Sequence, residues 1–266
     1  MDPTASSQHD DRVTVCATAV IAACVVTIAH EAAGHGSACL AAGGRIVRLT
    51  SVYFSCSVHS AWVAPAGPAG NLAAAAAARA LLIVLPAGRP RARLLLLLVM
   101  AFSLFWAAGY LLYSMTLGVG DYAIAERDAF GKGGWPAMLI GWSLGLLLYL
   151  VAIRATTRAA QPFARPSTPA STSRARSLLG LSWLAASLAA CVAAAFYAPG
   201  RLDAVRQAAL ELGAASLPLL FVAPRARAGT QLEPPATRSG LWISLAVLLF
   251  LGFVLTLGRG VDAGPG

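Results

Sequence analysis

Residues 30–35, with the sequence His-Glu-Ala-Ala-Gly-His, combine side chains that could bind a metal ion and hydrolyse a bond. Neutral histidines are common zinc ligands, and a nearby glutamate serves as general base in zinc hydrolases. The stretch lies in an apolar run, because residues 13–29 carry no charge and the apolar character continues to residue 42. Since ionisable groups are costly at membrane depth, we interpret His30, Glu31 and His35 as a functional site.

The two histidines are five residues apart, one more than in the H-E-x-x-H zinc motif, whose ligands share one helix face. In a regular α-helix five residues advance about 500°, which leaves the rings roughly 140° apart. A single π-type turn would return both rings to one face, and Gly34 makes such a distortion less costly. In the alternative geometry the helix stays regular, Glu31 and His35 face together, and His30 points elsewhere.

The chain that must position these residues is typical of a membrane protein. Its mean hydropathy is positive, and several apolar runs exceed the ~18–20 residues that cross a bilayer. Segment 207–223 is interrupted by polar residues and Pro218, so it is a short span, a re-entrant piece or an interfacial helix. We expect an all-α polytopic membrane protein with six transmembrane helices, or seven if this segment crosses. The six predicted spans are 13–42, 67–86, 94–119, 135–154, 177–198 and 240–258.

The apolar runs divide the chain into four parts: a polar N-terminal tail (1–12), a membrane core with the candidate site (13–157), a basic flexible linker (158–176) and C-terminal transmembrane segments (177–266). The tail is acidic, so we do not expect the first span to be a cleaved signal peptide. Residues 43–65 are rich in β-branched and aromatic side chains with partial alternation, which predicts a short β-hairpin or extended loop after the first helix.

The net charge of +9 comes almost entirely from arginines in short loops between spans. Such arginines orient a membrane protein, so we expect the lipid bilayer as a partner and no nucleic acid. Their distribution places the N-terminus in the cytoplasm, and the last part of this count assumes that 207–223 crosses. The five cysteines are scattered without a C-x-x-C pair and imply no disulfide framework.

Two further polar residues lie at the ends of spans. Asn71 opens the second span and Asp121 closes the third, while His30, Glu31 and His35 lie in the last part of the first. An up-down-up arrangement brings these three ends to one membrane face. Two imidazoles, one carboxylate and an open position make a hydrolytic zinc site.

These residues resemble the site-2-type zinc intramembrane proteases. The matching parts are His-Glu at 30–31 with His-Gly at 35–36, Ala-Gly-Gly-Arg at 42–45 leading into the expected strand, and Gly-Pro-Ala-Gly-Asn at 67–71. The last corresponds to the family's G-P-x-x-N motif. The resemblance covers about residues 13–125. The family usually keeps the strand-bearing loop in the cytoplasm, opposite to the orientation that the arginines indicate.

The resemblance implies a role for each residue. His30 and His35 would be zinc ligands and Glu31 the general base. Asp121 would stand where the family's L-D-G motif supplies the third ligand, although Gly-Asp-Tyr stands here at 120–122. Asn71 would help to hold the substrate backbone or the oxyanion.

We therefore expect a membrane-embedded zinc metallopeptidase, multi-pass in a bacterial inner membrane, that cleaves membrane-tethered protein substrates in or near the membrane. One alternative is a catalytically inactive scaffold that retains the fold, which the five-residue spacing favours. Another is an ion- or proton-translocating protein, which predicts polar residues in later spans that spans four and six lack.

Purely structural explanations also exist for single residues. Asp121 could border a polar loop, and Asn71 could satisfy free N–H groups at a helix start. Cys56 and His59, on the loop facing the proposed site, are a weak signal for additional metal ligands.

Overall fold

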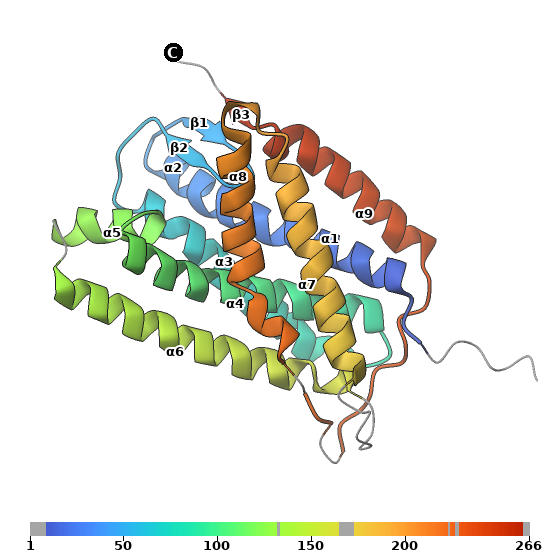
Figure 1. The fold of residues 1–266 in the computed structure, drawn as a ribbon. Coiled ribbons are helices and arrows are strands. Elements are labelled where there is room, and N and C mark those ends of the chain that lie inside the picture. The colour runs from blue at the N-terminus through green and yellow to red at the C-terminus, as the bar shows by residue number, and fades with distance from the viewer. Residues whose placement is uncertain (1–8, 132–133, 165–172, 223, 227–228, 263–266) are drawn as a thin grey trace, which may run out of the picture.

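The computed structural model describes residues 9–131, 134–164, 173–222, 224–226 and 229–262. Within this part of the chain, six helices are long and apolar enough to cross a membrane, which confirms the predicted all-α polytopic fold (Figure 1). The shorter α5 (Asp121–Phe130) follows the third of them. The six are α1 with its continuation (Arg12–Ala41), α3 (Val63–Val84), α4 (Pro90–Leu117), α6 (Trp135–Ala159), α7 (Ser173–Ala194) and α9 with its continuation (Gly240–Gly258).

The first span changes its winding at the histidine motif. α1 (Arg12–Ile28) begins after Asp11, whose carboxylate accepts a hydrogen bond from the Thr14 amide at 2.8 Å. It continues directly into a π-helical segment, Ala29–Gly36, and ends as α2 (Ser37–Ala41). The structure therefore has the widened turn, and the regular helix is not formed there.

A small antiparallel sheet lies beside this end of the first span. β1 (Ile46–Leu49) and β2 (Phe54–Cys56) form the predicted hairpin, and β3 (Val261–Asp262) from the C-terminal end pairs with the other edge of β1. The order is β2-β1-β3. β2 is thus an edge strand.

The expectation of no disulfide is wrong, because Cys39 and Cys56 are bonded. They are 17 residues apart in sequence, and their Cα atoms lie 5.8 Å apart. The cause is tertiary: the hairpin folds back over α2 and brings the end of β2 to it. Sequence spacing alone carries no signal for such a contact.

The core of the bundle is centred on α4. Its side chains Phe102, Phe105 and Trp106 are buried in a cluster that also takes residues from α1, α3 and α7. On α6 and α9 many large apolar side chains point outward, as lipid-facing helices require. These include Leu139, Ile140, Leu144, Leu147, Leu248 and Leu251.

Segment 207–223, for which the sequence allows three courses, belongs to a stretch that runs antiparallel to α7. This stretch consists of α8 (Arg201–Ala208), a second π-helical segment (Ala209–Ala214) and a 3₁₀ turn (Leu217–Leu220). Ala208 packs near the end of α7, Gly213 accepts a hydrogen bond from Trp183 at 2.8 Å, and Leu220 lies over Gly180. The segment therefore returns the chain across the bundle in broken helical pieces (Figure 1).

The two predicted membrane parts pack directly on each other, because α7 and α9 both contact α1. Arg174 at the start of α7 binds the Asp10 carboxylate at 2.8 and 2.9 Å. Of the predicted linker 158–176, residues 165–172 lie outside the described residues, as do residues 1–8 of the predicted tail.

Candidate metal centre

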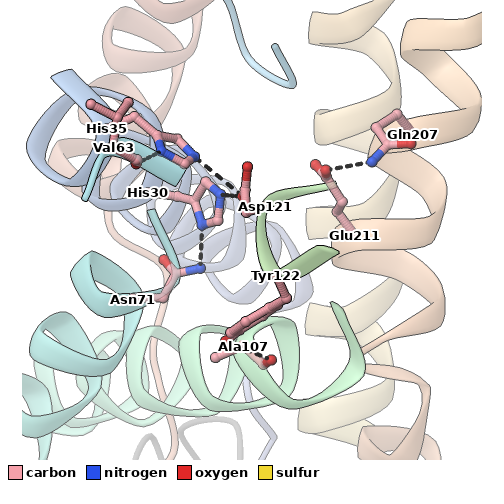
Figure 2. Close-up of polar contacts among 9 residues, drawn as sticks. All are labelled: His30, His35, Val63, Asn71, Ala107, Asp121, Tyr122, Gln207 and Glu211. Carbon is pink, nitrogen blue, oxygen red and sulfur yellow. Dashed lines mark hydrogen bonds and ion pairs between the residues drawn. The ribbon is translucent and has the colours of Figure 1, made fainter. Parts of the chain in front are cut away.

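The structure brings His30, His35 and Asp121 together in one buried group. Each offers a ligand atom, and these atoms all lie within 4.8 Å of one another. His30 Nε2 is 3.2 Å and His35 Nε2 3.3 Å from the same oxygen, Oδ2 of Asp121 (Figure 2). The widened turn accounts for this convergence, since it brings two rings five positions apart onto one face. The group could hold a metal ion.

His35 is oriented by partners on both sides of its ring. Its Nδ1 donates a hydrogen bond to the carbonyl oxygen of Val63 at 2.7 Å. Because a carbonyl only accepts, the ring proton is held on Nδ1 and Nε2 is left free for a metal. Phe54 of β2 stacks on the ring with centroids 5.3 Å apart.

His30 is held from behind by a buried amide and an indole ring. The Asn71 amide nitrogen donates to His30 Nδ1 at 3.0 Å, and the ring stacks on Trp106 at 4.6 Å between centroids with an 11° tilt. Asn71 is fully buried, and its Oδ1 has no hydrogen-bond partner among the described residues. It lies behind His30 and is not part of the cavity wall.

Glycines allow α3 to lie against the π-helical segment. A Cβ on Gly67 would lie 2.3 Å from His35 Nε2 and 2.7 Å from His30 Nε2. On Gly70 it would lie 2.3 Å from the Ala29 carbonyl oxygen, and on Gly34 2.5 Å from the Ala66 carbonyl oxygen. Any side chain larger than hydrogen at these positions would push the helices apart. Close packing of α3 against the π-helical segment thus explains the glycines of the Gly-Pro-Ala-Gly-Asn stretch.

Asp121 reaches the site because two glycines turn the chain after α4. Gly118 and Gly120 have φ values of 67° and 81°, a region that favours glycine, and α5 then begins at Asp121. Burial alone would raise the pKa of Asp121, but hydrogen bonds and charge interactions with His30 and His35 outweigh it and hold the pKa at about 2. The carboxylate is therefore ionised and available as a ligand.

Glu31 lies at the wall of a cavity of about 290 Å³ next to the group. It is 2% exposed, and its Oε2 has no hydrogen-bond partner among the described residues. A buried carboxylate oxygen without a partner is costly unless a ligand or water completes it. Besides the two histidines, Glu31 and Asp121, the side chains that line this cavity include Phe54, Cys56, His59, Tyr110, Asp128 and Glu211.

Cys56 and His59 do line the cavity, as their position on the facing loop suggested. Cys56 is in a disulfide, so it is not the thiolate that a metal ligand requires. His59 is exposed and its Nε2 lies 3.3 Å from Asp128 Oδ1. Neither belongs to the group of possible metal ligands.

Three residues of the site were not identified from sequence. Trp106 and Tyr110 lie on an apolar span where an aromatic residue is unremarkable. Glu211 carried a usable signal, a lone acidic residue in an apolar segment, but its place beside the first span depends on how the chain returns along α7.

Comparisons with family models, with curated proteins and with solved structures found no match for this chain. The chemistry and geometry of the group therefore carry the functional conclusion.

Proposed function

We propose that this chain is a membrane-embedded zinc metallopeptidase that hydrolyses peptide bonds in or near the membrane. The observation that carries the proposal is the π-helical segment, which turns both imidazoles toward one carboxylate oxygen. Two nitrogens and one carboxylate leave a fourth position of a tetrahedral zinc site open, as hydrolytic zinc sites do. The sequence resemblance to site-2-type proteases points to the same chemistry.

The residues present fit zinc. Both histidines have an Nε2 directed at the shared centre. His35 donates its Nδ1 proton to a carbonyl oxygen, as zinc-binding histidines usually do, and His30 Nδ1 is engaged by the Asn71 amide. Asp121 is ionised, and the unpartnered Glu31 carboxylate lies in the adjoining cavity. Zinc held there would polarise the scissile carbonyl and make water acidic enough to lose a proton near neutral pH.

Glu31 supplies the proton transfers in this proposal. Its buried carboxylate accepts the proton of the attacking water and then delivers it to the nitrogen of the departing amine.

Asn71 acts as a positioning residue in the proposal. With a metal on Nε2, His30 carries its proton on Nδ1 and must donate it. Rotation of the Asn71 amide would present the unpartnered Oδ1 as the acceptor. Because Asn71 lies behind His30 and outside the cavity wall, we assign it to His30 and not to the substrate.

The sheet offers a place for an extended substrate segment. β1 is paired on both sides, so the edge strands of the described sheet are β2 and β3, and β2 is the one whose residues line the cavity. Phe54 and Cys56 of β2 line the cavity. A membrane-tethered protein whose chain is locally extended would add to this edge and expose its backbone to the site. We place this reaction in the inner membrane of a bacterium, with the protein as a multi-pass component of the bilayer.

The proposal is tested with full-length protein reconstituted in vesicles together with a panel of membrane-tethered reporter proteins. We expect Glu31→Gln to lower the cleavage rate at least ~100-fold, the scale of general-base catalysis, while metal content is kept. Glu126→Gln is the matched control, because Glu126 lies on α5 outside the cavity wall. Equal cleavage by wild type and Glu31→Gln would contradict the mechanism, and bound metal without any cleavage would leave a non-catalytic scaffold.

A further inference from the structure

Glu211 is a second buried glutamate at the candidate metal centre. It is 4% exposed and belongs to the second π-helical segment, far from the first span in sequence. Figure 2 shows it projecting from the C-terminal helices toward Asp121, and it lines the same cavity as Glu31. The mechanism proposed above does not use it.

The carboxylate of Glu211 is only half satisfied. Oε1 accepts a hydrogen bond from the Gln207 amide at 2.7 Å. Oε2 is buried and has no hydrogen-bond partner in the part of the chain that the structure describes. Because an unpaired buried carboxylate oxygen is costly, its retention beside a cavity indicates a ligand that completes it.

The charge of the cavity restricts what that ligand can be. Four carboxylates line it, those of Glu31, Asp121, Asp128 and Glu211, and no lysine or arginine is among the lining residues that the structure describes. A divalent metal ion would compensate two negative charges, which leaves Glu211 without a positive partner when it is ionised. An additional cation is therefore the species that the wall around Glu211 fits.

A second metal ion is not supported as this cation. Among the described residues, the one group of three or more possible metal ligands is His30, His35 and Asp121, and Glu211 is outside it. A single carboxylate backed by an amide suits an organic cation instead, since an ammonium or guanidinium needs one or two charge-assisted hydrogen bonds.

We infer that Glu211 binds a lysine or arginine side chain of the peptide substrate and thereby selects substrates with a basic residue near the cleaved bond. This inference rests on the proposed function. The location allows this contact, because the site lies at one end of the first span, where a long basic side chain can extend along apolar surface toward the membrane boundary.

The test measures peptide binding, so that it does not require turnover. The probes are short fluorescein-labelled peptides with blocked ends and one central lysine, and in two comparison peptides methionine or glutamate replaces this lysine. Their binding to full-length protein in nanodiscs is measured. Fluorescence anisotropy gives each dissociation constant. We expect wild type to bind the lysine peptide about tenfold more tightly than the methionine peptide, and Glu211→Gln to reduce this preference to less than about twofold.

The controls separate the inference from the proposed function. Glu211→Gln keeps an oxygen for Gln207, so the fold should be retained, and metal content measured in parallel should equal that of wild type. Glu126→Gln should leave the lysine preference unchanged. Loss of the preference in Glu211→Gln supports the inference even if no metal or cleavage is found. A lysine preference absent from wild type, or kept by Glu211→Gln, overturns it whatever the outcome of the cleavage assay.

Discussion

His30 and His35 are fixed by what lies behind and beside their rings. Val63 and Asn71 engage the two Nδ1 atoms, while Phe54 and Trp106 stack on the faces. Such partners decide which ring nitrogen is free and where it points, and losing one typically lowers metal affinity about 10–100-fold. The residues around the rings are therefore expected to control zinc affinity as strongly as the geometry of the ligands does.

Gly67→Ala should lower zinc affinity by at least about tenfold, because its methyl group would occupy the space next to both Nε2 atoms. Isothermal titration with zinc measures the change. Gly252→Ala is the matched control, since a Cβ at Gly252 on α9 meets no atom within 4 Å. Unchanged zinc affinity in Gly67→Ala would show that the ion does not lie between these rings.

Asn71→Asp and Asn71→Leu should differ sharply. The aspartate variant keeps an oxygen that accepts the His30 Nδ1 proton, so its zinc affinity should stay within about threefold of wild type, whereas the leucine variant should lose about 10–100-fold. The same titration compares them. If both variants lose cleavage while both keep zinc, Asn71 acts on the substrate, the role that the sequence resemblance implies, and our assignment to His30 is wrong.

At the scale of elements, the π-helical segment Ala29–Gly36 is the feature that makes the five-residue spacing useful. A π-type turn accommodates one extra residue in an otherwise regular helix, so the flanking α1 and α2 keep their faces. The sequence showed that such a turn was needed if both histidines were to share an ion. It could not choose between the two geometries, because the choice depends on α3 packing against Gly34 and on the contacts to Val63 and Asn71.

Removal of Ala33 tests this interpretation. The shortened motif reads His-Glu-Ala-Gly-His, which a regular helix presents on one face, so we expect zinc binding to be kept with little change in the flanking helices. Removal of Ala22, which is buried in the regular part of α1, is the control. That deletion rotates one part of the helix by about 100° against the other and should destabilise the protein. Loss of zinc in the first deletion would contradict the insertion model.

Some elements could be predicted from the sequence and others could not. The length of the apolar runs was enough to predict the six spans, and the β-branched residues were enough to predict the hairpin. The strand β3, the Cys39–Cys56 disulfide and the place of Glu211 depend on contacts between residues remote in sequence. No local pattern encodes those contacts.

At the scale of the whole molecule, the disulfide lies at the end of the bundle that carries fewer arginines. The Cys39–Cys56 bond is beside the candidate metal centre, and such bonds persist on the oxidising side of a membrane. The other end carries more arginine, which is typical of the cytoplasmic side. The arginines near that end, among the described residues, include Arg89, Arg91, Arg93, Arg158, Arg174, Arg176 and Arg238.

We therefore predict that the metal centre opens to the side opposite the cytoplasm. In a variant without Cys16, Cys24 and Cys191, a cysteine introduced by Ala61→Cys should react with a membrane-impermeant maleimide in intact cells. One introduced by Thr237→Cys should react only after lysis. Both positions are exposed, so access to the reagent decides the result. The reverse pattern would support the orientation usual for site-2-type proteases.

The central claim is that a widened helical turn lets His30 and His35 hold one ion with Asp121. The most direct measurement is the zinc content of purified, zinc-loaded and dialysed protein. We expect about one zinc per chain in wild type and in Glu31→Gln, and almost none in His30→Ala, His35→Ala or Asp121→Ala. A wild-type protein that retains no zinc, or a His35→Ala variant that retains as much as wild type, would contradict the account.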